Sequence, residues 1–320
     1  MKTLSRKEAI DKLEQDALDS KRLYEKPLTQ WRLALRRFRE RRSGMIGLGI
    51  ITALVLVAIF APLIAPYGPR DILIGVEDVS RYESPCIHLL GCPDDRPQHI
   101  LGIDGNVRDE FSRVIYGSRV SLTLGFFTVT LALFVGAAIG AVAGFKGGWF
   151  DNIIMRFMDV ILGFPSLLLA IAIVAVLGPG LRNALIAIAV VTMPGYARVM
   201  RAQVLAIKES DFVSASRALG ASPTQLLVRR VIPNAMTPLV VLATLGVATA
   251  ILEAAGLSFL GLGAQPPMAE WGSMLASERN QVFTAPHLVF FPGLAIMITV
   301  LGFNLMGDGL RDALDPTLNK

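Results

Sequence analysis

Charged side chains, cysteine and histidine are all scarce in this sequence of 320 residues. Asp, Glu, Lys and Arg make up 18% of the chain and hydrophobic residues 53%, a balance too apolar for an ordinary soluble domain. Two cysteines and three histidines supply too few ligands for a metal cluster and too few thiols for a disulfide scaffold. Composition therefore favours an integral membrane protein, and we assign no metal site.

Several catalytic and nucleotide-binding motifs are also missing from the sequence. No segment matches G-x-x-x-x-G-K-[ST], and the nearest, Gly140–Lys146, fails both the spacing and the following hydroxyl residue. The sequence likewise lacks HExxH and a GxSxG elbow. We therefore expect a chain that is not an enzyme, holds no cofactor of its own and does not hydrolyse ATP.

Apolar stretches long enough to cross a membrane occur six times. A bilayer core needs about 20 mostly apolar helical residues. Stretches of this kind lie at Gly44–Pro66, Ser121–Phe145, Ile153–Leu177, Leu181–Met200, Thr237–Ala255 and Leu288–Met306. The first is longer than the apolar part of a secretory signal and is followed by prolines, so we interpret it as a retained anchor. The expected fold class is all-α, with six transmembrane helices.

Basic residues set the expected orientation. Residues 1–43 carry 13 Lys and Arg against 7 Asp and Glu, whereas residues 67–113 carry 5 against 9. Because basic flanks stay in the cytoplasm, we expect both termini inside. The basic run Trp31–Arg42 precedes an apolar span, which favours a topology signal or a surface for membrane lipid headgroups over a nucleic-acid site. The expected units are a cytoplasmic segment (1–43), a first span (44–66), an extracytoplasmic loop (67–116), a core of five spans (117–308) and a cytoplasmic tail (309–320).

The expected outer loop is polar and contains both cysteines. Cys86 and Cys92 are close in sequence, and an extracytoplasmic location permits a disulfide, which we favour over two free thiols. His88 and His99 lie in the same loop without zinc-like spacing, so we interpret them as solvated loop histidines.

Two acidic residues fall within the predicted spans. Ionisable groups in a membrane are candidates for function, so Asp159 and Glu253 are possible pathway or gate residues. Structural roles are the alternative: Asp159 could pair with Arg156 one turn away, and Glu253 could brace the helix break expected at Gly256–Gly263. No longer acid or histidine relay is present, which argues against a proton-driven pump.

Glycines and prolines suggest where helices pack and bend. Gly136, Gly140 and Gly144 form a small-xxx-small ladder, a general packing feature of membrane helices. Pro165 and the segment Gly261–Trp271 mark places where helices bend or stop. They could shape a gate, and an ordinary kink and a surface loop are equally compatible with the pattern.

The segment between the fourth and fifth spans predicts two short helices. Asp211 is a natural N-cap and Gly220 a natural C′ stop for the first. Ser222 and Pro223 supply an N-cap and an N1 proline for the second, which Pro233 is expected to interrupt before the fifth span. Four side chains of the first helix share one face and form a small apolar knob suited to a socket on a partner: Phe212, Ala215, Ser216 and Leu219.

In this segment the string SASRALG followed by IP resembles the cytoplasmic signature of binding-protein-dependent ABC importer permeases of the dipeptide and oligopeptide type. That signature is E-A-A, glycine after three residues, and I-x-L-P after nine more. The residues on motif positions are Ala215, Gly220 and Pro233. The departures are Ser214 for the glutamate, Ser216 for the second alanine, Arg230 for isoleucine and Ile232 for leucine. Further family-like strings are LGIDGNVRDEFSRVIYGSRVSL, MDVILGFPSLLLAI, EAAGLSFLGLG and GDGLRDALDP, so the resemblance extends from about residue 30 to the end.

The resemblance implies a type I importer permease fold in a prokaryotic plasma membrane. It implies a second, homologous permease as partner, two ABC ATPase subunits that bind ATP and magnesium, and an extracytoplasmic solute-binding protein. The first short helix would then dock on an ATPase subunit as a coupling helix through Asp211, Phe212, Val213, Ser214, Ala215, Ser216, Arg217, Ala218, Leu219 and Gly220. Expected substrates are dipeptides or oligopeptides, and relatives of this architecture also carry nickel, glutathione, sugars or antimicrobial peptides.

Two other classes of protein remain open from the residues alone. A secondary transporter or channel would show inverted repeats and midplane ion ligands, and the sequence has no clear internal repeat. A membrane-embedded assembly protein would co-purify with partners without ATP-stimulated uptake.

Overall fold

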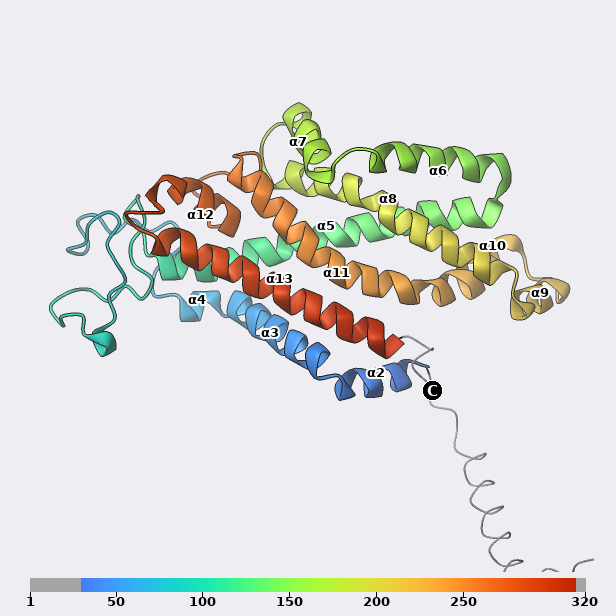
Figure 1. Ribbon diagram of the computed structural model, residues 1–320, viewed down its shortest axis with the longest axis horizontal. Helices are drawn as coiled ribbons and strands as arrows, with labels where there is room; N and C mark the ends of the chain where they lie inside the picture. Colours follow the sequence, from blue (N-terminus) through green and yellow to red (C-terminus); the bar gives the residue numbers. More distant parts are fainter. Residues whose placement is uncertain (1–29, 315–320) are drawn as a thin grey trace, which may run out of the picture.

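The protein is an elongated bundle of helices with a long irregular loop at one end (Figure 1). The computed structural model describes residues 30–314, so residues 1–29 of the predicted cytoplasmic segment (1–43) and 315–320 of the predicted tail (309–320) lie outside the described residues. Between residues 30 and 314 the only β-structure is three isolated bridges. The all-α prediction is therefore confirmed for this part of the chain. The helices are α2 (Gln30–Glu40), α3 (Arg42–Ile59), α4 (Ala61–Ile64), α5 (Glu110–Lys146), α6 (Gly148–Leu162), α7 (Ser166–Leu177), α8 (Leu181–Lys208), α9 (Asp211–Ala218), α10 (Pro223–Leu226), α11 (Ile232–Phe259), α12 (Trp271–Glu278) and α13 (His287–Leu314).

Five helices of the described chain are individually long and apolar enough to cross a membrane, and a sixth span exists if α6 and α7 are counted together. The five are α3, α5, α8, α13 and the continuous helix Pro223–Phe259 that contains α11. Most extend beyond the predicted apolar stretches, because polar turns continue the helices past the apolar segments. The predicted number of spans is thus matched only when the bent pair is included.

The third predicted span, Ile153–Leu177, is broken at Pro165, one of the places where the sequence predicted a helix to bend or stop. It consists of α6 and α7, whose axes are bent by 93° at the intervening residues. The backbone of Pro165 is extended (φ −57°, ψ 126°), and proline lacks the N–H that would continue the helical bonds. The bend therefore follows from the Gly163-Phe164-Pro165 sequence. We call α6 and α7 together the broken span.

The helices pack through glycines where two backbones come close. The predicted ladder faces α8: a Cβ on Gly136 or Gly140 would overlap carbonyl oxygens of Met193 and Ala197. Gly44 and Gly309 bring α3 and α13 together in the same way. Only glycine allows this separation, so these positions fix the distances between the helices.

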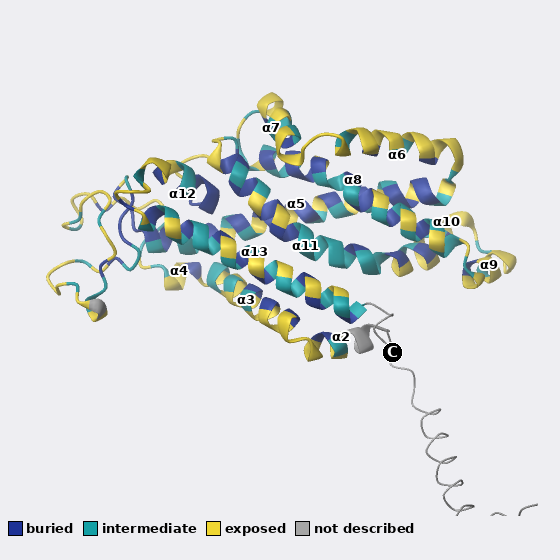
Figure 2. Cartoon of the chain, viewed as in Figure 1, coloured by how far each residue is buried: buried dark blue, intermediate teal, exposed yellow. Residues whose placement is uncertain are grey.

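The apolar core lies where α5, α7, α8 and α11 meet. Its buried side chains include Leu124, Ala170, Ile188, Ile251 and Leu257. Buried positions follow the inner faces of these helices, whereas most of α6 and much of α7 is exposed (Figure 2). Large apolar side chains remain on the outer surface, as expected for helices that face lipid or another membrane subunit. They include Phe126, Phe134, Phe157, Leu168 and Leu301.

The bundle has two distinct ends (Figure 1). Residues 65–109 and α12 form one, which we call the loop end. The opposite end carries α9 and α10, and we call it the α9 end. The end of α13 and the α2 helix also lie toward the α9 end, so the two ends of the described chain are on the same side.

Candidate functional site: the α9 helix and the broken span

The α9 helix is capped one residue earlier than predicted. The cap position is Ser210, with extended backbone (φ −73°, ψ 152°), and Asp211 is the first helical residue. The assignment of Asp211 as the N-cap is therefore wrong. The Ser210 hydroxyl donates to the carbonyl of Ile207 at 2.6 Å and so links α8 to α9. In the first turn, the Asp211 carboxylate lies where the partial positive charge of the helix N-terminus favours an anion.

The α9 helix ends in a Schellman motif. The amide of Ala221 donates to the carbonyl of Ser216 at 3.1 Å, and the amide of Gly220 donates to Arg217 at 3.0 Å. Gly220 has φ +86°, the left-handed conformation that favours glycine at this position. The predicted stop at Gly220 is where the structure places it. The turn directs the chain from α9 into α10.

A single buried side chain anchors α9 to the bundle. Val213 is fully buried in a cluster with Val204, Leu226 and Val231. The other face of α9 is exposed: Phe212 is 46% and Leu219 89% exposed. Ala215 is also exposed and Ser216 is half-buried. The predicted apolar knob thus projects from the α9 end with no contact within the described chain that would bury it.

The helix that follows α9 is continuous and not interrupted as predicted. The Ser222 hydroxyl accepts a hydrogen bond from the Gln225 amide at 3.3 Å, and Pro223 is the first helical residue of α10. A π-helical turn, Leu227–Val231, then leads directly into α11. Pro233 lies inside this continuous helix, because it falls in the first turn of α11, just after the wider turn.

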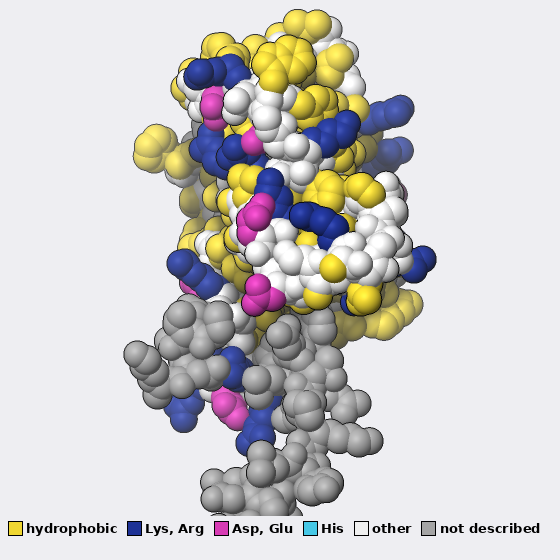
Figure 3. Space-filling model, turned by 90° about the vertical axis from the view of Figure 1, so that its right-hand side faces the viewer, with side chains coloured by type: hydrophobic (Ala, Val, Ile, Leu, Met, Phe, Trp, Pro, Cys, Tyr) yellow, Lys and Arg dark blue, Asp and Glu magenta, His cyan; other side chains and the backbone are white. Residues whose placement is uncertain are grey.

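The α9 end is rich in basic side chains (Figure 3). Arg217 on α9 is exposed, as are Arg229 and Arg230 on the π-helical turn. The Arg230 carbonyl on this turn accepts a hydrogen bond from the Asn234 side chain at 2.6 Å. Exposed basic side chains therefore lie at the same end of the bundle as the knob.

Two ion pairs join α6 to α8. Asp159 accepts a hydrogen bond from Arg198 at 2.8 Å, so the predicted pairing with Arg156 is wrong. Asp151, only 4% exposed, accepts two bonds from Arg201 at 2.6 and 2.7 Å. Sequence reasoning missed this second pair because its residues are fifty positions apart, and only the folded packing of α6 on α8 brings them together.

Glu253 lies within α11 and does not cap a helix break. The predicted break at Gly256–Gly263 is confirmed, because α11 ends at Phe259, within that segment. The Glu253 side chain is half-buried and interacts with the Ser166 hydroxyl at the first residue of α7. Its Oε2 atom is buried without a hydrogen-bond partner in the described chain. Glu253 thus contacts the broken span directly beside Pro165.

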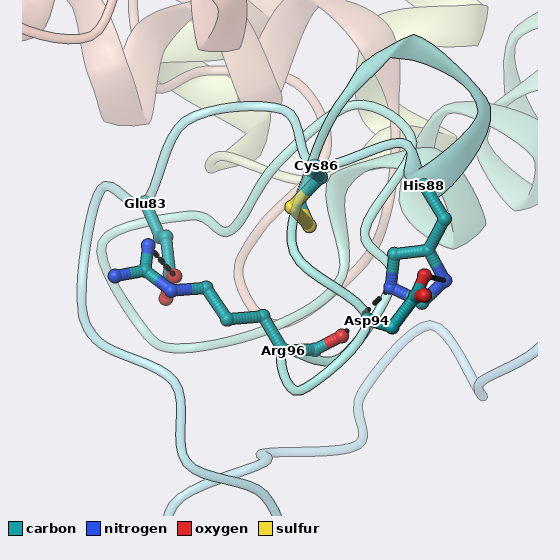
Figure 4. Close-up of a disulfide and its surroundings, with 6 residues drawn as sticks. Glu83, Cys86, His88, Asp94 and Arg96 are labelled. Carbon is teal, nitrogen blue, oxygen red and sulfur yellow. Dashed lines mark hydrogen bonds and ion pairs between the residues drawn. A yellow bond between two sulfur atoms is a disulfide. The ribbon is translucent and has the colours of Figure 1, made fainter.

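At the loop end, Cys86 and Cys92 form a disulfide, with Cα atoms 5.4 Å apart (Figure 4). Polar contacts surround it. The Nε2 atom of His88 is 2.8 Å from the Arg96 carbonyl, and the Arg96 guanidinium is 3.9 Å from Glu83. The bridge and these contacts fold the tip of the loop back on itself.

His99 is not a solvated loop histidine, contrary to the prediction. It is 2% exposed and lies between Asp109, at 2.8 Å, and Glu77, at 3.1 Å. The Tyr67 ring stacks on it, with centroids 5.6 Å apart, and the Tyr67 hydroxyl donates to Glu77 at 2.7 Å. Burial by itself lowers the pKa of His99, but the hydrogen bonds and charges of Asp109 and Glu77 outweigh burial and raise it above 6.5.

A second polar cluster at the loop end was not predicted. The Arg108 side chain donates a hydrogen bond to Asp104 at 2.7 Å, and both side chains are nearly inaccessible to solvent.

The Glu270 carboxylate caps α12 by accepting hydrogen bonds from the amides of Gly272 and Ser273 at 3.0 and 2.8 Å. Burial raises the pKa of Glu270, and these hydrogen bonds oppose the rise. Glu270 belongs to the segment that was expected to bend or stop. Its position directly before the Trp-Gly-Ser start of α12 was the sequence signal that could have identified it as the helix cap.

Among the described residues, no group of three or more His, Cys, Asp or Glu side chains is placed to hold a metal ion.

Comparisons with known proteins agree on one family. Residues 136–320 match the profile described as "Binding-protein-dependent transport system inner membrane component". Residues 29–85 match the N-terminal TM domain of oligopeptide transport permease C. Among solved structures, the inward-facing MetNI methionine ABC transporter is similar in fold: its TM-score is 0.53 at 19% identity, over 63% of this chain and 96% of that chain.

Two curated relatives are similar over most of their length. The dipeptide transport system permease protein DppC of Alkalihalophilus pseudofirmus is 46% identical over 91% of this chain and 91% of its own. The glutathione transport system permease protein GsiD of Escherichia coli is 44% identical over the same shares. The chain belongs to the binding-protein-dependent transport system inner membrane components, the permeases of ABC importers.

Proposed function

We propose that this chain, with a second and similar permease, forms the membrane pathway of an importer for small peptides. Two ABC ATPase subunits would bind ATP and magnesium at the α9 end, and a solute-binding protein would deliver cargo at the loop end. ATP hydrolysis is assigned to the partner subunits, because this sequence has no phosphate-binding loop.

The observation that carries this proposal is the exposed face of α9. A short helix with one fully buried anchor, Val213, and a projecting Phe212 and Leu219 is built to enter a groove. The Schellman turn at Gly220 fixes the end of that helix and its angle to the rest of the chain. ATP-dependent movement of the groove would then displace α9 and the two long helices connected to it, α8 and α11.

The proposed orientation places the α9 end in the cytoplasm. Exposed Arg217, Arg229 and Arg230 lie there, consistent with the preference of basic residues for the cytoplasmic side. The disulfide lies at the loop end, which suits an oxidising compartment outside the plasma membrane. Because the described chain begins and ends toward the α9 end, both termini are assigned to the cytoplasm (Figure 1).

The substrate assignment rests on the relatives. One transports dipeptides and another glutathione according to their names, and both cargos are short peptides with a free ammonium and free carboxylates. We therefore assign di- and tripeptide-sized solutes in preference to sugars or free metal ions.

The test is purification of the tagged chain from native membranes in mild detergent, followed by mass spectrometry and reconstitution in liposomes. We expect a second permease and two ATPases to co-purify, and ATP-dependent uptake of labelled dipeptide or glutathione in the presence of the binding protein. A disaccharide serves as the control cargo. A protein recovered without ATPases would refute the importer assignment, and uptake of the disaccharide alone would refute the substrate class.

A further inference from the structure

The α6 helix has little apolar attachment to the rest of the bundle. Of its fifteen residues only Asp151 and Met158 are buried. The α7 helix is held differently, because Ala170 and Val174 are fully buried in the main core. The half of the broken span nearer the α9 end therefore depends on polar contacts for its position.

Those contacts are made mainly to α8 and lie on one face of each helix. Asp151 and Asp159 are eight residues apart on α6, and their partners Arg201 and Arg198 are three apart on α8. Three- and four-residue spacings, and their sums, return to the same helix face, so the two pairs form a row. The Asp151–Arg201 pair is bidentate and has a carboxylate shielded from water, the geometry in which an ion pair is most directional.

The same helix carries α9. The α8 helix ends at Lys208, about two turns beyond Arg201, and the chain then enters α9 at Asp211. The Lys208 ammonium also donates to the Gly144 carbonyl at 3.2 Å, which ties this end of α8 to α5. Movement of α9 is thus applied to α8 close to the point where α6 is attached.

We propose that Asp151 and Asp159 are positioning residues that make α6 move with α8, so that displacement of α9 reaches the bend of the broken span. This inference rests on the proposed function, because it assumes that partner subunits displace α9. Separating Arg201 from the shielded Asp151 carboxylate would leave an uncompensated buried charge, which is costly. The pairs therefore resist separation of α6 from α8 while leaving the 93° bend free to change.

The first test measures the α6–α8 distance directly. Spin labels at Ile153 on α6 and Ala202 on α8, both exposed, report this distance in the reconstituted complex with and without ATP. We expect one narrow distance distribution in both states, and a broadened one after Asp151→Asn with Asp159→Asn. A distance that differs between the two states of the otherwise unmodified complex overturns the proposal. This readout does not depend on the identity of the cargo, so it remains decisive if the assigned substrate is wrong.

The second test measures solute transported per ATP hydrolysed. The double Asn variant should lower this ratio about tenfold, within the range of coupling between sites in proteins. Arg156→Gln is the matched control on the same helix, with an exposed side chain outside the row, and should keep the ratio of the unmodified complex. An unchanged ratio in the double variant, at normal yields of assembled complex, overturns the proposal.

Charge exchange separates positioning from a simple contribution to stability. Asp159 and Arg198 are 51% and 58% exposed in their side chains, so exchanging them requires no repacking. Asp159→Asn alone should assemble normally and lower the ratio, and Asp159→Arg combined with Arg198→Asp should restore it to within about twofold, because the attraction is re-formed. Assembly equal to the unmodified complex with no recovery on exchange overturns the assignment of this pair.

Discussion

Replacing Gly220 isolates the contribution of the α9 terminus. The residue has φ +86°, and an added Cβ would meet no atom within 4 Å. The Cβ of alanine, asparagine or valine therefore meets no neighbour, and the expected effect depends on how well each backbone adopts this conformation. A left-handed conformation costs a non-glycine residue about 1–2 kcal/mol, and asparagine tolerates it best. For valine this energy corresponds to about a 5- to 30-fold loss of correctly terminated α9.

The assay is ATP-dependent uptake and ATP hydrolysis in the reconstituted complex. We expect Gly220→Val to lower uptake by up to this factor while the permease remains folded, because the strain is confined to an exposed turn. Gly220→Asn is the matched control and should stay within about twofold of the unmodified complex. Full uptake in the valine variant, or equal losses in valine and asparagine variants, would refute the reasoning from backbone geometry.

Three further predictions concern the bundle and the loop end. Gly140→Ala should cost about 1–3 kcal/mol and lower the melting temperature in detergent, because its Cβ would overlap the α8 backbone, whereas Gly195→Ala, where nothing lies within 4 Å, should be neutral. Since the folded state raises the pKa of His99, its stabilisation is present below pH 6.5 and lost as pH rises through the folded pKa; the protection of amides 99–109, measured relative to their intrinsic exchange rates, should fall there, and His99→Gln should abolish that fall. Cys86→Ser with Cys92→Ser should loosen the loop by about 2 kcal/mol, read by limited proteolysis, with no change in helix melting. Equal melting of the two glycine variants, amide protection that does not change with pH, or unchanged cleavage would contradict the respective arguments.

Local signals in the sequence were sufficient for much of the fold. Apolar length predicted the spans, because the bilayer requires it, and the glycine ladder predicted the close approach of α5 to a neighbour. The helix stop at Gly220 and the helix cap at Ser222 could be predicted from the sequence because both depend on residues within a few positions. Proximity in sequence likewise predicted the disulfide.

The predictions that failed depended on distant partners or on small shifts of register. Asp159 pairs with Arg198 instead of Arg156 because α8 packs on α6. Spacing along the sequence does not predict this packing. His99 is buried by Tyr67 and two carboxylates from other parts of the loop. Pro233 was expected to break a helix, but its position in the first turn of α11 leaves few bonds to lose. The docking role of α9 stays a prediction from the family.

The length of α5 has a consequence for the outer surface of the protein. Its 37 residues give a helix about 55 Å long, whereas a bilayer with its headgroups is about 40–45 Å thick. Even at an average tilt, one end must rise clear of the lipid, and the buried polar residues near Glu110 mark that end. Folded polypeptide would therefore stand above the headgroups at this end, and under the proposed function a solute-binding protein would contact that polypeptide instead of the membrane surface.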